Sequence, residues 1–179
     1  MIHTQTIQKG ADLHAGIRRG IVACVVVFVA VLILSALWDA SIRVLHVFEA
    51  LLYLVIATLA FRPSKFAYAL TFAGGVMWLW CGSGLTTFVR NGFQMLLLSV
   101  RTGHVQRPDL LIAIPAALAT GGLVLLALTG YGKIRGKSAA DFLLFAACFG
   151  GVWAFYLCIF AAFTPRYLQM FQPVWRLFG

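Results

Sequence analysis

Glu49 and His46 are the residues whose type and spacing could carry chemistry inside an apolar part of this chain. Glu49 is the only acid placed within a predicted apolar segment instead of at its edge, and the apolar run of residues 50–61 follows it. His46 lies three residues earlier, so both side chains share one helix face and can hydrogen-bond. Because ionisable groups inside a membrane are costly and usually face a cavity or a partner, the pair predicts a proton relay or a cation contact.

A structural interpretation of Glu49 stays open beside the functional one. Glu49 lies about two helical turns from the start of its segment, so its carboxylate could reach the interface or pair with Arg43. A tight hairpin over residues 38–43 would also bring Asp39 close. Pairing at the interface and a role in transport are therefore both retained.

Neither a metal site nor a cofactor site is predicted. His46 and Glu49 have an H-x-x-E spacing, but a metal site needs three or four convergent ligands, and the other histidines lie in polar segments. The cysteines all fall in apolar segments without a C-x-x-C pair, and buried cysteine usually behaves as a small apolar residue. The residues considered are His3, His14, His104, Cys24, Cys81, Cys148 and Cys158.

The segment after residue 80 carries no catalytic motif. Gly82-Ser83-Gly84 does not match G-x-S-x-G, and no acid, base and electrophile can be assembled within reach of one another, so the interpretation leans against an enzyme. The glycines favour a bend or a helix end near the bilayer surface. Polar residues in and after this bend are candidates for contact with lipid headgroups or a partner, namely Arg90, Asn91, Arg101 and Arg107.

Five segments are long and apolar enough to cross a bilayer, which requires about 20 apolar helical residues. With 62% hydrophobic and 11% charged residues, the chain lies far from the composition of a soluble domain. The expected fold is therefore an all-α, polytopic transmembrane helical bundle in a lipid bilayer. The predicted spans are residues 21–37, 44–61, 66–85, 110–130 and 142–163.

The chain predicts a single membrane domain over residues 1–179. Within it we expect a polar lead-in over residues 1–20, a helical bundle over 21–163 and a surface-lying tail over 164–179. The connections at 38–43 and 62–65 are so short that the first three helices should pack as antiparallel neighbours. Residues 88–100 are only about half the length of a span, so an interfacial helix or a re-entrant segment is expected there.

Small residues recur at helix-packing spacing in the last two predicted spans. Such faces allow close backbone approach in lipid, where hydrophobicity does not drive helix against helix. These spans are expected to pack there, on each other or on a partner. The helix-packing candidates are Ala113, Ala117, Gly121, Ala147 and Gly151.

The net charge of +9 is spread over every connection instead of forming one basic stripe. This pattern suits anionic headgroups and makes nucleic acid a poor partner. A five-span topology places eight Lys and Arg on the amino-terminal side and six on the other, so the positive-inside rule favours a cytoplasmic amino terminus. The expected location is the plasma (inner) membrane.

The leading functional interpretation is a non-catalytic subunit of a larger membrane assembly, in contact with other membrane-protein subunits or with copies of itself. Small size and few polar groups within the spans favour it, because a carrier normally needs more polar lining near the bilayer midplane. The alternative is a small proton- or cation-coupled transporter or channel that uses Glu49 and His46.

Overall fold

The computed structural model describes residues 2–165 and 168, with side-chain surroundings from residue 14 onward. Every regular element in this part of the chain is helical, and it contains no strand. Short 3-10 and π-helical turns separate some of the helices. The elements are α1 (Ile2–Trp38), the 3-10 turn η1 (Ala40–Ile42), α2 (Arg43–Leu59), α3 (Lys65–Trp80), the π-helical turn η2 (Cys81–Leu85), α4 (Phe88–Thr102), α5 (Pro108–Leu111), α6 (Ala113–Lys133) and α7 (Ala140–Phe163).

Four helical stretches in the described part of the chain are long and apolar enough to cross a membrane, and a bent pair adds a possible fifth. These findings confirm the all-helical class and a composition compatible with several membrane crossings. The four stretches are His14–Trp38, Ala40–Leu59, Pro108–Lys133 and Ala140–Phe163, and the bent pair joins Lys65–Leu85 to Phe88–Thr102.

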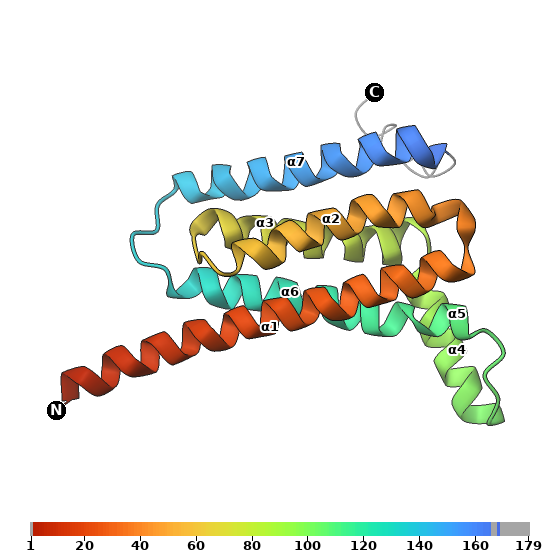
Figure 1. Cartoon of the computed structure of the whole chain (residues 1–179), viewed down its shortest axis with the longest axis horizontal. Helices are drawn as coiled ribbons and strands as arrows, with labels where there is room; N and C mark the ends of the chain where they lie inside the picture. The colour runs from red at the N-terminus through yellow and green to blue at the C-terminus, as the bar shows by residue number, and fades with distance from the viewer. Residues whose placement is uncertain (1, 166–167, 169–179) are drawn as a thin grey trace.

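α1 is longer than the sequence interpretation expected. Residues 2–20, treated as a separate polar lead-in, are continuous with the first apolar segment in one helix of 37 residues. At 1.5 Å per residue such a helix is about 55 Å long, and its amino-terminal end projects beyond the other helices (Figure 1). No proline interrupts residues 2–20, so the helix is not broken before the apolar run. The expected surface-lying tail over 164–179 falls mostly outside the described residues.

Side-chain hydrogen bonds to the backbone hold the two tight turns that join α1 to α2 and α2 to α3. Asp39 caps η1 by accepting a hydrogen bond from the Ser41 amide at 2.8 Å, and Arg43 Nε donates to the Ala36 carbonyl at 2.8 Å. Ser64 caps α3, because its hydroxyl accepts a hydrogen bond from the Ala67 amide at 3.1 Å. These bonds satisfy backbone groups that the helix ends leave free.

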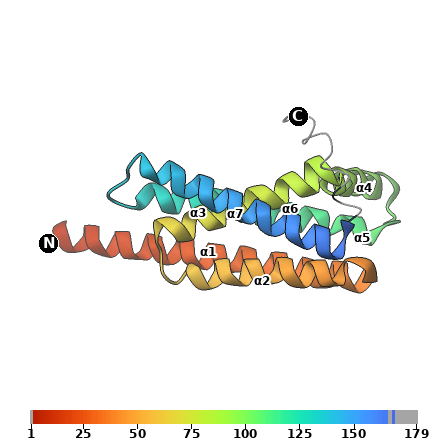
Figure 2. The ribbon, with the colours of Figure 1, turned by 90° about the horizontal axis from the view of Figure 1, so that it is seen from above.

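The helices pack around α3, which contacts both α6 and α7 along its length. α1 packs against α6 and α2, whereas the contact between α2 and α3 is much smaller. The compact three-helix unit expected for α1 to α3 is therefore replaced by a bundle in which α6 packs against both α1 and α3, while α1 and α2 lie side by side (Figures 1 and 2). Short connections make helices antiparallel, but they do not decide which helix faces fit together.

Glycines on α3 and α6 allow the closest helix contacts. A Cβ atom added at Gly75 would lie 2.8 Å from the Thr120 carbonyl oxygen, so the backbones of α3 and α6 meet there. A Cβ atom added at Gly130 would collide with the Tyr68 ring. Small residues at such crossings let helices pack by close van der Waals contact in lipid.

A bend of 69° separates α3 and η2 from α4. η2 is a π-helical turn of five residues, and Thr87 after it has a left-handed backbone with φ of 54°. The bend directs α4 away from the long axis of the bundle (Figure 1). The two buried residues of α4, Val89 and Gly92, lie near its start, where the helix meets the bundle.

Candidate functional site

The hairpin of α1 and α2 positions the predicted pair His46 and Glu49. His46 lies three residues into α2 and Glu49 six, which corresponds to about 4.5 and 9 Å along the helix axis. Glu49 is buried, with 5% of its surface exposed. Arg43, the other partner considered for Glu49, bonds to the Ala36 carbonyl instead.

His46 joins Glu49 to α1 through two hydrogen bonds. Its Nδ1 lies 2.7 Å from Glu49 Oε2, and its Nε2 lies 3.0 Å from Ser35 Oγ. With a neutral ring and a carboxylate, Nδ1–H donates to Glu49 and Nε2 accepts from the Ser35 hydroxyl. With a protonated ring, both nitrogens donate. The three side chains therefore form a short path along which a proton can be held or moved.

Beyond Glu49 lies a cluster of buried polar groups from three parts of the chain. They are Tyr53 on α2, Cys81 on η2 and Tyr156 on α7, all of which are buried. Tyr53 and Tyr156 are fully buried, and the Tyr53 hydroxyl donates to the Gly74 carbonyl at 2.9 Å. The Tyr156 hydroxyl lies beside that of Tyr53 but makes no hydrogen bond of standard geometry within the described residues.

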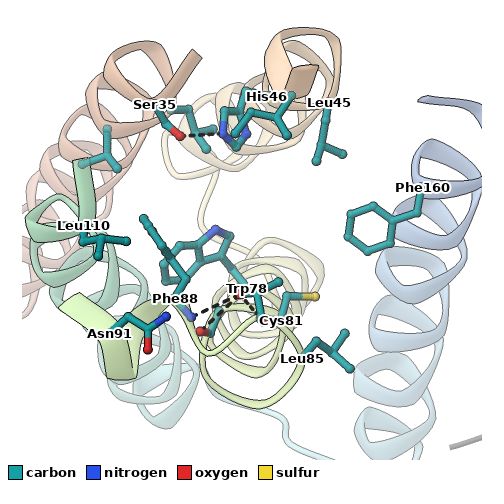
Figure 3. A pocket seen from close by; sticks show the side chains of 15 residues that line it. Ser35, Leu45, His46, Trp78, Cys81, Leu85, Phe88, Asn91, Leu110 and Phe160 are labelled. Atoms are coloured by element: carbon teal, nitrogen blue, oxygen red, sulfur yellow. Dashed lines mark hydrogen bonds between the residues drawn. The ribbon is translucent and has the colours of Figure 1, made fainter. Parts of the chain in front are cut away.

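A pocket of about 550 Å³ opens beside His46 at the same end of the bundle (Figure 3). α1 and α2 form one wall, with Ser35 and His46, and η2 and α4 form the opposite wall, with Cys81 and Asn91. Most of the lining is apolar. The complete lining comprises Val31, Leu32, Ser35, Ile42, Leu45, His46, Trp78, Cys81, Gly82, Leu85, Thr86, Phe88, Asn91, Leu110 and Phe160.

The irregular backbone between α3 and α4 shapes this second wall. The π-helical turn at Cys81–Leu85 contributes Cys81, Gly82 and Leu85 to the pocket, and π-helical turns occur frequently at functional sites. Thr86 Oγ1 donates to the Cys81 carbonyl at 3.0 Å, and it accepts a hydrogen bond from the Phe88 amide at 3.4 Å. These bonds satisfy part of the backbone that the bend leaves without helical partners.

The four residues predicted to contact headgroups or a partner lie in different surroundings. Arg90 and Arg101 are exposed on α4, while Asn91 is half-buried and lines the pocket. Arg107 is exposed and paired with Asp109, with contacts of 2.9 and 2.6 Å. Asn91 is thus the only one of the four that lines the pocket, on the wall opposite His46.

The five helix-packing candidates separate into inward and outward positions. Ala113 is buried, and it faces Gly92 where α4 crosses the start of α6. Ala117 and Gly121 are half-buried on α6, whereas Ala147 and Gly151 on α7 are exposed. α6 and α7 scarcely touch each other, because each packs on α3.

One polar network was not predicted from the sequence. Lys65 Nζ donates to Asp141 Oδ1 at 2.7 Å and to the Gly136 carbonyl at 2.6 Å, and the Tyr131 hydroxyl donates to Asp141 Oδ2 at 2.8 Å. The sequence marked Asp141 only as part of a capping-box pattern with Ser138, whose amide does donate to Asp141 Oδ2 at 3.2 Å. The only sequence signal for this contact was that Lys65 and Asp141 each lie at the start of a predicted span, with opposite charges.

The described part of the chain contains no group of three or more His, Cys, Asp or Glu side chains close enough to hold a metal ion. The chemistry that the site itself offers is hydrogen bonding and proton transfer, through Ser35, His46 and Glu49. Comparisons with protein-family models, with curated proteins and with solved structures gave no match for this chain.

Proposed function

We propose that this chain is a multi-pass integral membrane protein with five crossings, in which α3 forms the third and α4 lies at the interface. Large apolar side chains on the outside of the helices support this proposal, because an aqueous protein rarely exposes so many of them. Leu118 is 70% exposed, Leu125 67%, Phe142 75% and Leu143 69%. The bend before α4 and the apolar and basic faces of that helix suit a position at headgroup depth.

The proposed location is the plasma (inner) membrane, with the amino terminus in the cytoplasm. The loop after α2 and the loop between α6 and α7 lie on the same side as the start of α1 in a five-crossing topology. These two loops and the helix ends beside them carry Arg62, Lys65, Lys133, Arg135 and Lys137. The positive-inside rule favours the cytoplasm for such a side.

Within that membrane, we propose that the protein is a non-catalytic subunit that binds a transmembrane helix of another subunit along α7. The observation that carries the proposal is a row of small residues on the outward face of α7, here called the small-residue face. No heavy atom lies within 4 Å of a Cβ atom added at Gly150 or Gly151, so a neighbouring helix could approach closely. The face consists of the exposed residues Ala146, Ala147, Gly150, Gly151, Ala154, Cys158, Ala161 and Ala162.

Contact with lipid explains the Ala and Gly residues of the small-residue face less well than contact with a second helix does. Exposed positions elsewhere on the bundle carry large apolar side chains such as Leu118 and Leu125 on α6, which fill space against lipid tails. A face of Ala and Gly leaves a shallow groove that a second helix fills better than mobile chains do. The short connections between the helices agree with a role inside an assembly.

Purification in mild detergent tests the subunit proposal. We expect a second polypeptide at fixed stoichiometry, and we expect Ala147→Leu combined with Gly151→Leu to reduce its recovery at least about tenfold by blocking close approach. Ala30→Leu is the matched control, since Ala30 is equally an exposed alanine but lies on α1. A monodisperse monomer or homo-oligomer, or equal loss of the partner with Ala30→Leu, contradicts the proposal.

A proton or cation relay is the second candidate function, favoured by the 2.7 Å contact of His46 with the buried Glu49. For this candidate we expect Glu49→Gln to abolish proton flux in reconstituted vesicles, because the amide keeps the size of the side chain but cannot release a proton. Asp109→Asn removes a surface carboxylate and serves as the control. Unchanged flux with Glu49→Gln would remove Glu49 from the path.

A further inference from the structure

The pocket beside His46 lies where a lipid-soluble molecule could enter with its polar end near the headgroups. His46 is about 4.5 Å along α2 from the start of that helix, compared with a hydrocarbon half-thickness of about 15 Å. The pocket is partly open, and its volume of about 550 Å³ falls within the range of small-molecule sites, about 300–1,000 Å³. Its depth therefore suits a polar head at the membrane boundary and an apolar tail in lipid.

The pocket carries groups that can donate hydrogen bonds on two opposite walls (Figure 3). On one wall, His46 Nε2 lies 3.0 Å from Ser35 Oγ, and with a protonated ring it donates its N–H to that oxygen. In this state the Ser35 hydroxyl keeps its own O–H for an incoming oxygen, and that oxygen can also replace Ser35 as the acceptor of the Nε2–H. On the other wall, the Asn91 amide uses one N–H for Thr87 Oγ1 at 3.3 Å and keeps a second N–H. A ligand with acceptor oxygens on two edges would match both walls.

The charges of His46 and Glu49 favour a neutral ligand in the pocket. In the state in which His46 is protonated and donates from Nε2, the Glu49 carboxylate balances the charge of the ring, so the pair adds no net charge to the pocket. A ligand carboxylate would meet the field of Glu49 without an unpaired cation in the pocket lining to offset it. A carbonyl oxygen needs only a donor, which the histidine held by Glu49 supplies.

Aromatic side chains favour a planar ring in the space between the walls. Trp78, Phe88 and Phe160 line the pocket, and the remainder is largely aliphatic. The Trp78 ring is held in place by an edge contact with Phe28, with ring centroids 5.2 Å apart. Such surfaces pack well against a flat, uncharged ring.

We propose that this pocket binds a lipid-soluble molecule of the quinone class, a planar ring with carbonyl oxygens on two edges and an apolar tail. His46, held by Glu49, donates to one carbonyl, and Asn91 donates to the other. The proposal concerns binding alone and goes beyond the subunit function, which depends on a different face of the molecule.

Saturable quenching of tryptophan fluorescence by decylubiquinone, in protein reconstituted into phosphatidylcholine nanodiscs, tests the inference. We expect saturable binding to the wild-type protein and an apparent Kd at least about tenfold weaker for His46→Leu, equivalent to ~1.4 kcal/mol. His104→Leu is the matched control, because His104 is exposed outside the pocket, and it should bind as the wild type does. Decylbenzene, which has the tail but no carbonyl and does not quench tryptophan, is added as a competitor, and it should displace decylubiquinone only at concentrations at least about tenfold above those of the quinone.

Asn91→Leu keeps the test decisive if His46→Leu does not fold, as judged by its helical circular dichroism. It removes the donor on the opposite wall, and the same weakening is expected. Quenching that rises linearly without saturation in the wild-type protein would show partition into lipid only and would overturn the proposal. Equal affinity of the wild type, His46→Leu and Asn91→Leu would overturn it as well.

Discussion

At the scale of single residues, local spacing and long-range packing contributed different parts of the site. The i, i+3 spacing of His46 and Glu49 placed them on one helix face, and the structure joins them at 2.7 Å. Ser35 could not be assigned to this group from the sequence, because its contact with His46 depends on how α1 and α2 pack side by side. Their role as a relay stays a prediction.

The network of Lys65 and Asp141 carries a prediction at the same scale. Asp141→Asn should lower the thermal unfolding midpoint by several degrees, because Lys65 would lose its carboxylate partner at the junction of α3, α6 and α7. Asp109→Asn also removes an acid, but from the exposed pair with Arg107, so it should change the midpoint little. Thermal unfolding in one detergent compares the two variants, and equal midpoints would count against a structural role for the network.

At the scale of elements, hydropathy located the helices but not their neighbours. Residues 66–85 were expected as one span, and they form α3 and the turn η2. A short helix was expected near residues 88–100, and α4 covers Phe88–Thr102. The packing order differed, because the sequence favoured contact of α1 to α3 with one another, whereas α6 lies against both α1 and α3. Contacts between helices depend on surfaces that fit together. Gly75 allows close packing of α3 on α6 because the Thr120 backbone lies opposite it.

The crossing of α3 and α6 can be tested with two alanine substitutions. Gly75→Ala should destabilise the protein by about 1–3 kcal/mol, because the new methyl group would lie 2.8 Å from the Thr120 carbonyl oxygen. Gly121→Ala on α6 has no heavy atom within 4 Å of the added carbon, and it should be neutral or stabilising by up to about 1 kcal/mol. Unfolding by a denaturing detergent measures both, and a Gly75→Ala protein as stable as the wild type would argue against this crossing.

At the scale of the whole molecule, the arrangement of helices decides which surfaces remain for partners. The sequence marked Ala147 and Gly151 as packing residues without saying what packs on them. Because α7 uses its opposite face against α3, these residues point outward. The same packing leaves α4 projecting at one end of the bundle, next to the pocket (Figure 1).

The five-crossing topology predicts the accessibility of two exposed loop positions. In intact spheroplasts, a membrane-impermeant maleimide should label Gln106→Cys, in the loop after α4, whereas Lys137→Cys, in the loop before α7, should react only after lysis. The wild-type protein is the control, since its four native cysteines all lie in helices or in the π-helical turn within the bundle. The reverse labelling would invert the orientation, and labelling of both positions from one side would exclude five crossings.

The sequence by itself determined the class of this protein, because helix formation and suitability for lipid depend on runs of neighbouring residues. It also paired His46 with Glu49, since three residues along a helix define a shared face. Only the tertiary structure decided that Ser35, His46 and Asn91 share a pocket, that Lys65 meets Asp141, and that the small-residue face points outward. The physical reason is that these contacts join residues far apart in the chain, and they arise from the complementary shapes of whole helix surfaces.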